Sequence, residues 1–446
     1  MKERDSNLKE GIKFLAEKFK QESENQEIQI ISHYDTDGIN SAAIMIQSLQ
    51  KLDKKFTLKI VKSLDENFIQ NLDKEKIIFF LDLASGSLKH LEKTELKNIF
   101  ILDHHEIDKK IPKNINIVNP ELYSEKQKIS GAGLTYLFCK ELDESNKEFA
   151  KLAILGMIGD TLEKDIDSLN HGILDDGEIQ RKRGLLIYPA TRPLNRTLEY
   201  SSSPYIPEVT GNIKGVLELL REIGLSPKDG KYKSLIELND AEMEKLTTAV
   251  ILRNPKTKNK KIVGDIFLIK LFNKLEDARE ISAKINACSR YGESETAIGL
   301  CMEIPEAKKR AETIHVKHRQ AIIDGLKTAK EIQKISGKQF TIINAKEKIK
   351  DTIIGTIASI LSNSPNYEEG TVITTMAYSE DKIKISSRIV GKHKKNVREI
   401  LNEIIQKIGG EVGGHKNAAG GIISQEKEEE FLNHLQKSLE IEKIKV

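Results

Sequence analysis

The stretch 28-IQIISHYDTDG-38 passes directly from an apolar run into a histidine, two aspartates and a glycine. The apolar run, residues 28–32, has the length and composition of a buried β-strand. His33, Asp35 and Asp37 follow where that strand is expected to end. Carboxylates gathered at the end of a buried strand repel one another unless a cation neutralises them. The stretch therefore predicts a strand that ends at a cation site.

Short apolar runs recur after this strand and alternate with segments of helical periodicity. The runs span residues 28–32, 56–61, 76–84, 98–103 and 114–119. The helical segments span residues 40–52, 131–142 and 149–161. Such alternation is typical of a parallel sheet covered by helices. We therefore expect an α/β catalytic domain built on a parallel sheet.

The middle of the chain has a different pattern. Residues 164–214 are polar and contain glycine, proline and basic residues, which favours a loop or an insertion boundary. Short helices are expected over 215–252, and 256–261 reads as an exposed basic turn. Residues 306–335 lack proline and carry Ala, Ile and Leu at helical intervals, which predicts one long connecting helix.

A smaller domain of mixed α/β type is predicted after the long helix. Its expected elements are strands at 339–344, 371–379 and 382–390, a helix at 396–408 and a glycine-rich segment at 409–421. The second and third strands read as a hairpin. The expected organisation is a catalytic core at 1–163, a helical insertion at 164–285, the end of the catalytic domain at 286–305, the connecting helix at 306–335 and the second domain at 336–446.

Composition restricts the class of protein. A chain of 446 residues is long enough for two to four compact units. Lys and Arg (71) nearly balance Asp and Glu (68), so an anion-binding site must be a local patch.

Three cysteines without a Cys-x-x-Cys spacing favour a reducing compartment. Because no apolar run is long enough to span a bilayer and the first residues are too charged for a signal peptide, we expect a soluble cytoplasmic protein without a membrane partner.

Three of the early strand candidates end in charged residues. The carboxyl ends of parallel strands line one crevice, so these side chains are expected to converge there. The set comprises His33, Asp35, Asp37, Asp82, Asp103, His104 and His105, and Asp160 at the end of an apolar helix could close it. If the segment around Asp35 and Asp37 stays extended, both side chains point the same way. A single aspartate after a strand is more often a helix cap, but several at successive strand ends favour a metal site.

The ligand types indicate which metal the site would hold. Aspartate and histidine without thiolate suit Mn²⁺ or Mg²⁺ rather than structural zinc. Two such ions about 4 Å apart would activate a water and stabilise a pentavalent phosphorus transition state. Asp82 is expected to bridge the two ions because it follows the middle strand of the set.

At these residues the chain resembles the DHH phosphoesterase superfamily. The matching motifs are 35-DTDG-38, Asp82, 103-DHH-105, 156-GMIGD-160 and, in the style of the associated DHHA1 domain, 413-GGHKNAAGG-421. Within the superfamily, 286-NACSRYG-292, the apolar and strand-like AIGLCM after it and the long helix resemble RecJ-type single-strand exonucleases. The SHxDxDG opening is similar to that of archaeal RecJ-like nucleases, relatives of a eukaryotic replicative-helicase cofactor.

The resemblance implies roles for individual residues. Two metals would be bound by Asp35, Asp37, Asp82, His104 and Asp160, with Asp82 shared. The catalytic set would be Asp82, Asp160 and His105, with His105 beside the scissile phosphate. Arg290, next to Asn286, would hold a phosphate, and Ser386 and Arg388 would grip the terminal 5′ phosphate. Gly414 and His415 would bring backbone N–H groups and an imidazole toward the nucleotide.

His33 stays open as a further metal ligand. In pyrophosphatase-like and short-oligonucleotide members of the superfamily a metal-binding histidine lies four residues before the first aspartate of the DxD, a position that is Ile31 here. His33 lies two residues before Asp35, where bacterial RecJ proteins carry aspartate. This departure favours the RecJ branch.

The leading functional hypothesis is a nuclease. It is an exonuclease that uses two Mn²⁺ or Mg²⁺ ions to hydrolyse single-stranded DNA from the 5′ end in replication or repair, with RNA as a second possible substrate. With 5% aromatic residues and no Trp, recognition should depend on the nucleic-acid backbone. Two alternatives remain: a phosphodiesterase of oligonucleotides or cyclic dinucleotides, and a replication scaffold that binds the GINS complex or a repair helicase.

Overall fold

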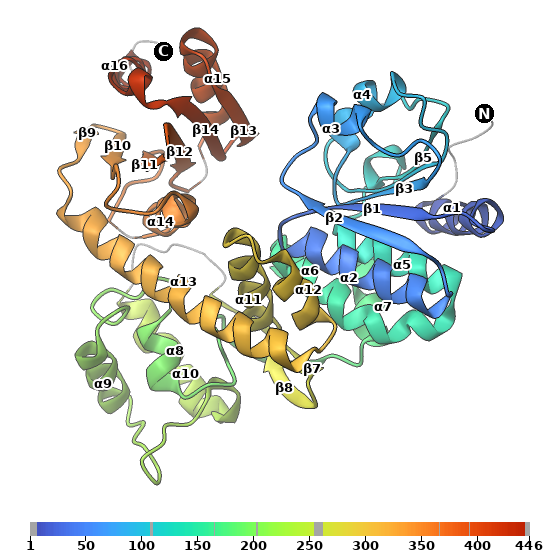
Figure 1. Cartoon of the computed structure of the whole chain (residues 1–446). Helices are drawn as coiled ribbons and strands as arrows, with labels where there is room; N and C mark the ends of the chain where they lie inside the picture. Colours follow the sequence, from blue (N-terminus) through green and yellow to red (C-terminus); the bar gives the residue numbers. More distant parts are fainter. Residues whose placement is uncertain are drawn as a thin grey trace. The chain divides into compact units, whose positions relative to one another are not determined.

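The computed structural model describes residues 7–107, 110–164, 166–201, 204–253, 262–364, 366–391 and 393–441. The chain forms two compact units, shown in Figure 1. The first comprises residues 1–183 and 264–315, and the second comprises residues 184–263 and 316–446. The predicted basic turn at 256–261 lies outside the described residues.

A parallel sheet of five strands organises the first unit, as predicted. The strands are β1 (Ile28–His33), β2 (Phe56–Val61), β3 (Ile77–Leu81), β4 (Ile99–Leu102) and β5 (Ile115–Val118). Their order is β2-β1-β3-β4-β5, and every neighbouring pair is parallel. Because all five strands run the same way, their carboxyl ends lie at one edge, with β3 in the middle.

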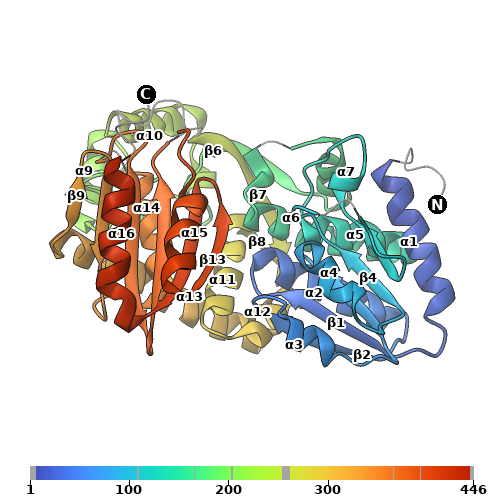
Figure 2. The same cartoon turned by 90° about the horizontal axis from the view of Figure 1, so that it is seen from above.

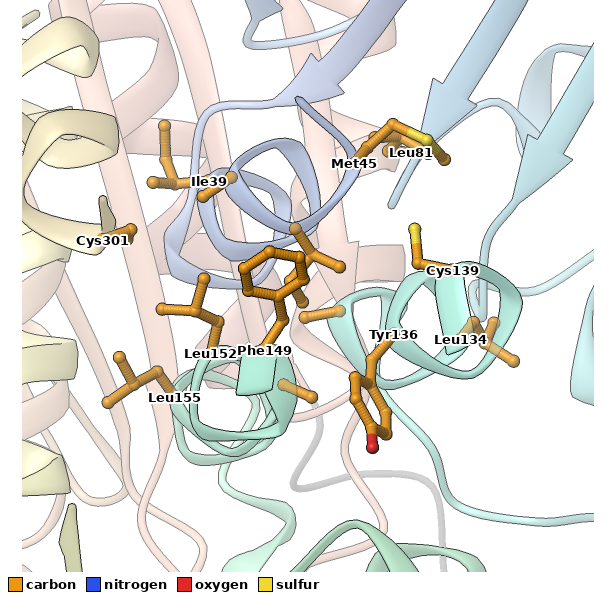
Figure 3. Close-up of a cluster of buried hydrophobic side chains, with 14 of the residues drawn as sticks. Ile39, Met45, Leu81, Leu134, Tyr136, Cys139, Phe149, Leu152, Leu155 and Cys301 are labelled. Carbon is orange, nitrogen blue, oxygen red and sulfur yellow. The ribbon is translucent and has the colours of Figure 1, made fainter. Parts of the chain in front are cut away.

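Helices cover both faces of this sheet. One layer contains α1 (Leu8–Glu22), α2 (Thr36–Lys51), α5 (Gly131–Leu142), α6 (Ala150–Gly159) and α7 (Ser168–Asp176). Figure 3 shows part of their core, where Ile39 of α2, Leu134 of α5 and Leu152 of α6 are buried. The short helices α3 (Glu66–Gln70) and α4 (Leu88–Glu92) pack on the other face. The inner strands β3 and β4 are therefore buried on both sides, which explains their continuous apolar sequences, whereas the edge strand β2 is partly exposed.

One sequence-based expectation for the first unit is wrong, and a second needs more detail. The apolar segment AIGLCM forms most of α12 (Ser294–Cys301), not a strand. Its buried residues pack against α11 (Ala278–Arg290) and α2. An apolar run this short does not show whether its period is that of a helix or of a strand. The polar stretch 164–214, expected to be a loop or an insertion boundary, contains α7, β6 (Gln180–Leu185) and α8 (Leu194–Glu199), and a boundary between the two compact units falls within it after residue 183. Strand β6 forms a small sheet with β7 (Val263–Leu271) and β8 (Lys274–Asp277), two strands that were not predicted.

A mixed sheet of six strands organises the second unit. Its order is β13-β14-β12-β11-β10-β9. The strands are β9 (Ile335–Gly337), β10 (Phe340–Asn344), β11 (Val372–Ser379), β12 (Lys382–Ile389), β13 (Glu411–His415) and β14 (Ala418–Ser424). Strands β10 and β11 are parallel and the remaining pairs are antiparallel, including the predicted hairpin of β11 and β12. The mixed α/β class predicted for this part of the chain is confirmed.

Helices pack on both faces of the mixed sheet. Helices α15 (Val397–Ile408) and α16 (Glu428–Ile441) cover one face, as Figure 2 shows. Helix α14 (Asp351–Ser362) and the second half of α13 (Pro305–Glu331) pack on the other face. Helix α13 is the predicted long helix, although it ends at Glu331. The second unit also contains α9 (Ile213–Glu222) and α10 (Asp240–Leu252), and within the described residues no helix is long and apolar enough to cross a bilayer.

Candidate metal centre

The carboxyl edge of the parallel sheet gathers most of the predicted ligands. His33 is the last residue of β1, Asp82 follows β3, and Asp103 follows β4. Asp160 is the C-cap of α6, the apolar helix of the first unit. The predicted convergence of strand ends is therefore present in the structure.

The DxD segment does not stay extended, which corrects one prediction. Asp35 is the N-cap of α2, and its carboxylate accepts a hydrogen bond from the Gly38 amide at 3.0 Å. Asp37 lies in the first turn of that helix. Extended geometry ends at Asp35 because an aspartate at this position satisfies an otherwise unpaired helix N–H. A side chain at Gly38 would lie 2.3 Å from the His33 carbonyl oxygen, so this tight turn requires glycine.

Three groups of side chains could each hold a cation, and we call them the cation groups. Within each group the ligand atoms lie within 4.8 Å of one another. The groups are His33–Asp35–Asp82, Asp37–His104–Asp160 and Asp82–His104–His105. Asp35 and Asp37 therefore belong to different groups, whereas Asp82 and His104 each belong to two. Such overlap is what two neighbouring cation positions with a shared ligand require. His33, which the sequence left open, lies inside the first group.

Asp37 is held by the N-terminus of a neighbouring helix. Its two oxygens accept hydrogen bonds from the amides of Gly131 (2.5 Å) and Ala132 (3.0 Å), the first residues of α5. A side chain at Gly156 would come within 2.2 Å of Asp37 Oδ1. Backbone amides at a helix N-terminus favour negative charge, so the fold fixes this buried carboxylate in one orientation.

Asp82 has unusual geometry and no hydrogen-bond partner for its carboxylate. Its φ of 58° is left-handed, a conformation that is uncommon for residues other than glycine. Both carboxylate oxygens are buried without a hydrogen-bond partner, and His104 Nε2 lies 3.2 Å from Oδ1. The same nitrogen lies 3.1 Å from Asp160 Oδ2, which is also buried without such a partner. Orphaned, buried oxygens from carboxylates fit a hard divalent cation.

Burial and mutual repulsion change the protonation of these groups. Burial, reinforced by the charges of Asp37 and Asp35, raises the pKa of Asp82 well above its usual range. Burial, reinforced by Asp37, raises the pKa of Asp160 to about 9. Burial opposes a charge on His33, but the carboxylates of Asp35 and Asp82, 3.0 Å and 3.6 Å from its Nδ1, outweigh burial and raise the His33 pKa to about 11. Without a cation the centre therefore retains protons, and a divalent ion would replace them.

Asp103 does not join the three cation groups. Its carboxylate accepts hydrogen bonds from the amides of Ser85 (2.8 Å) and His104 (2.8 Å) and from the ring Nδ1 of His105 (2.7 Å). Burial opposes ionisation of Asp103, but the hydrogen bonds from His105 and Ser85 keep its pKa well below the usual range. The hydrogen bond to Asp103 in turn raises the pKa of His105. Asp103 is thus a hydrogen-bond acceptor that orients a neighbouring imidazole.

Sequence reasoning missed the residues that support this arrangement. Asn119, fully buried, donates from Nδ2 to Ser85 Oγ (2.9 Å) and to the carbonyl of His105 (2.9 Å). The N-terminal amides of α5 were also missed. Signals for both exist in hindsight: an Asn-Pro pair after β5, and Ser130, the N-cap residue, before the glycine-rich start of α5.

Asn286 and Arg290 lie together on α11. Arg290 Nε donates to Asn286 Oδ1 at 3.1 Å, one turn away along the helix, and both side chains are half-buried. Helix α11 packs against α6 and α2, which carry Asp160 and the DxD segment at their ends. Neither residue belongs to the three cation groups. Their role in binding a phosphate stays a prediction.

The second unit brings the other predicted substrate-binding residues to one face of its sheet. Arg388 of β12 pairs with Ala418 of β14, which in turn pairs with His415 of β13, so these residues form one row. Ser386 lies two residues before Arg388 and therefore on the same face. Arg388 Nε donates to Ser359 Oγ of α14 at 3.0 Å. Gly414 lies beside His415 in β13, so the glycine-rich segment is a β-hairpin rather than a loop.

Comparison with known proteins identifies the family to which this fold belongs. The chain matches the DHH family N-terminal domain over residues 27–157, the DHH-CID domain over 188–262 and the DHHA1 domain over 332–440. An uncharacterized protein of Methanocaldococcus jannaschii is 28% identical over 92% of this chain and 92% of its own length. The single-stranded-DNA-specific exonuclease RecJ of Thermus thermophilus is 29% identical, but the alignment spans only 34% of this chain and 25% of RecJ.

Solved structures give the same assignment of fold. A crystal structure of exonuclease RecJ bound to manganese covers 96% of this chain and 93% of its own, with a TM-score of 0.60 and 18% identity. The crystal structure of CDC45 from Entamoeba histolytica matches over 96% of this chain and 99% of the CDC45 chain, with a TM-score of 0.71 and 11% identity. A parallel sheet with an Asp/His cluster at its carboxyl edge, followed in the sequence by a mixed-sheet unit, defines a DHH-type phosphoesterase architecture. The chain belongs to the DHH/DHHA1 superfamily and is RecJ-like in fold.

Proposed function

We propose that the protein is a metal-dependent exonuclease that hydrolyses phosphodiester bonds of single-stranded DNA. Family membership indicates a hydrolase of phosphoester or phosphodiester bonds. The observation that carries the proposal is the overlap of the cation groups at Asp82, whose two buried oxygens have no hydrogen-bond partner. A RecJ neighbour of the same fold is described as bound to manganese, and another as bound to Mg²⁺.

The residues suit a centre with two Mn²⁺ or Mg²⁺ ions. His33 and Asp35 would hold one ion, Asp37, His104 and Asp160 would hold the other, and Asp82 would serve both. When bound, the ions would supply an activated water and neutralise charge on the scissile phosphate. Backbone amides at Gly131 and Ala132 orient the Asp37 carboxylate. His105, oriented by Asp103, can donate a hydrogen bond to a phosphate oxygen.

The second unit offers groups for the nucleic-acid backbone. Arg388 and Ser386 present a guanidinium and a hydroxyl on one sheet face, and His415 lies in the same cross-strand row as Arg388. A guanidinium matches the geometry of a phosphate, so we assign the terminal 5′ phosphate to Arg388 and Ser386. A terminal phosphate bound there would direct degradation from the 5′ end. Arg290 and Asn286 of the first unit would contact an internal phosphate.

Digestion of single-stranded DNA labelled at either end tests this proposal. The full-length protein with Mn²⁺ should release mononucleotides from the 5′ end of a 30-mer, and EDTA should abolish the reaction. Asp160→Ala should lose nuclease activity while it stays folded. Rapid turnover of a dinucleotide with an intact 30-mer would instead support a small-substrate phosphodiesterase. Parallel reactions on RNA would show whether RNA is also a substrate.

A second role is favoured by one observation. The fold covers nearly the whole of the CDC45 chain with a TM-score of 0.71, although the identity is 11%. We expect the segment that matches the DHH-CID domain, residues 188–262, to contribute the surface for a partner. We therefore propose the GINS complex or a replicative or repair helicase as a partner of the nuclease. A pull-down with the full chain that recovers no such component would oppose this role.

A further inference from the structure

The peptide that carries His104 and His105 is held in place by a closed ring of hydrogen bonds. Asp103 accepts from the Ser85 amide, Ser85 Oγ accepts from Asn119, and Asn119 also donates to the His105 carbonyl. His105 Nδ1 then returns to Asp103 at 2.7 Å. Ser85, Asp103 and Asn119 are all buried. The ring thus connects β5, where Asn119 follows the strand, to the segments that follow β3 and β4.

The ring fixes which nitrogen of His105 is available. Within the described residues, the hydrogen bonds to Asp103 include those from the amides of Ser85, His104 and His105 and from the imidazole Nδ1, all of them donors to an ionised carboxylate. Nδ1 therefore carries its proton toward Asp103, and Nε2 is the atom left for a substrate. The side chain of His105 is 45% exposed, so that atom can be reached from solvent.

Asn119 is the member of the ring that holds the His105 backbone directly. Its Oδ1 accepts from the Glu121 amide at 2.9 Å, and its Nδ2 uses both protons within the ring. Both N–H groups of the Asn119 side chain therefore donate hydrogen bonds. Without Nδ2, the His105 carbonyl and Ser85 Oγ would both lose a buried donor.

We propose that Asn119 is a positioning residue for phosphodiester hydrolysis, because it holds the His105 peptide so that His105 Nε2 faces the reacting phosphate. This inference rests on the proposed function for its kinetic test. It assigns a role to a residue outside the cation groups, acting through His105. Displacement of a catalytic group by about 1 Å costs up to about 100-fold in rate, so loss of this hold should lower kcat rather than weaken substrate binding.

The chain contains a matched control for this residue. Asn146 is also fully buried, and its Nδ2 also donates to a serine hydroxyl (Ser48, 2.9 Å) and to a backbone carbonyl (Cys139, 2.8 Å). Asn146 belongs to the segment between α5 and α6 and to none of the cation groups. Asn119→Asp and Asn146→Asp therefore remove the same two kinds of hydrogen bond and place an oxygen against a carbonyl in both cases.

The test compares kcat and KM of the full-length variants on a 5′-phosphorylated single-stranded 30-mer with Mn²⁺. Asn119→Asp should lower kcat about tenfold or more and change KM less than about twofold, whereas Asn146→Asp should keep kcat within about twofold. If either aspartate variant does not fold, Asn119→Ala and Asn146→Ala replace the pair, because alanine places no oxygen against the carbonyl. Equal kcat values for the two positions in folded protein would overturn the proposal.

A second readout needs no substrate and so separates this inference from the proposed function. Protein labelled with ¹⁵N-histidine should show a downfield Nδ1 proton for His105, identified by its loss in His105→Gln. Asn119→Ala should shift or broaden this resonance, and Asn146→Ala should leave it unchanged. An unperturbed resonance in Asn119→Ala would contradict the proposal, even if the wild-type protein cleaved no DNA.

Discussion

Asp35 and Asp37 are separated by one residue, yet they belong to different cation groups. Asp35 is the N-cap of α2 and groups with His33 and Asp82, whereas Asp37 lies in the first turn and groups with His104 and Asp160. The start of a helix between them turns the second carboxylate away from the first. One short segment thus provides ligands to both sides of a centre that Asp82 connects.

Substitutions at Asp82 and Asp35 should therefore affect metal binding differently. Asp82→Asn removes the shared carboxylate and should weaken Mn²⁺ binding at both positions by at least about tenfold, whereas Asp35→Asn should weaken one. Isothermal titration calorimetry with Mn²⁺ measures this. Asp65→Asn is the control, because Asp65 caps α3 in the same way as Asp35 caps α2. Similar binding curves for Asp82→Asn and wild type would exclude the shared position.

Gly156→Ala should disrupt the centre from the side of α6. The added methyl group would lie 2.2 Å from Asp37 Oδ1 and 2.5 Å from Ala132 Cβ, so the carboxylate must move. We expect loss of one Mn²⁺ site and at least about a 100-fold fall in nuclease rate. Gly172→Ala in α7 is the matched control, since nothing lies within 4 Å of the added atom. Equal activity of the two variants would show that Asp37 tolerates displacement.

The metal-free protein should become less stable as pH rises from about 6.5 to 9. Asp160 has a pKa of 3.8 in the unfolded chain and about 9 in the fold, and His33 rises from 6.5 to about 11. In that pH window the folded state binds more protons than the unfolded state through both groups, so the free energy of unfolding falls with pH. Thermal unfolding at several pH values measures this. Saturating Mn²⁺ should raise Tm more at pH 8.5 than at pH 6. A larger increase in Tm at pH 6 would contradict the replacement of bound protons by the metal ion.

Arg388 should determine the preference for a 5′ phosphate. Arg388→Gln removes the guanidinium beside Ser386, and we expect cleavage of 5′-phosphorylated DNA to fall about tenfold or more while cleavage of 5′-hydroxyl DNA changes little. Arg398→Gln, an exposed position on α15, controls for the loss of one positive charge. A uniform loss on both substrates would assign Arg388 a structural role through its hydrogen bonds to Ser359 and Ala419.

Ala84 occupies a conformation that favours glycine. Its φ is 92°, so Ala84→Gly removes strain at the same time as it adds freedom to the unfolded chain. The free energy of unfolding should therefore change by less than about 0.5 kcal/mol or increase, whereas Ala321→Gly within α13 should cost about 1 kcal/mol. Urea denaturation compares the two. A larger loss for Ala84→Gly would mean that its methyl group contributes more packing than strain.

The sequence predicted the sheet and most of the centre because both depend on short-range patterns. Five apolar runs gave five parallel strands, and charges at their ends marked His33, Asp82 and His104. The apolar helix that ends at Asp160 was also recognised. These features need only the period of the apolar residues and the rule that parallel strands share one edge.

Features that depend on tertiary contacts could not be predicted in this way. From the sequence alone, residues 35–37 could either continue the strand or begin a helix. The hydrogen bond from the Gly38 amide to the Asp35 carboxylate stabilises the beginning of the helix. The support of Asp37 by α5 joins residues 94 and 95 positions apart. Asn119 reaches Ser85 across 34 positions. The short apolar run of α12 has no period of its own that distinguishes a helix from a strand.

The most direct test of the account is the number and coupling of Mn²⁺ ions bound by the full-length wild-type protein. Equilibrium binding combined with electron paramagnetic resonance measures both quantities on one sample. We predict two ions per chain at saturation with the spectrum of a spin-coupled pair, because Asp82 would serve both positions. Saturation with a single ion, or two ions without coupling, would contradict a centre shared through Asp82.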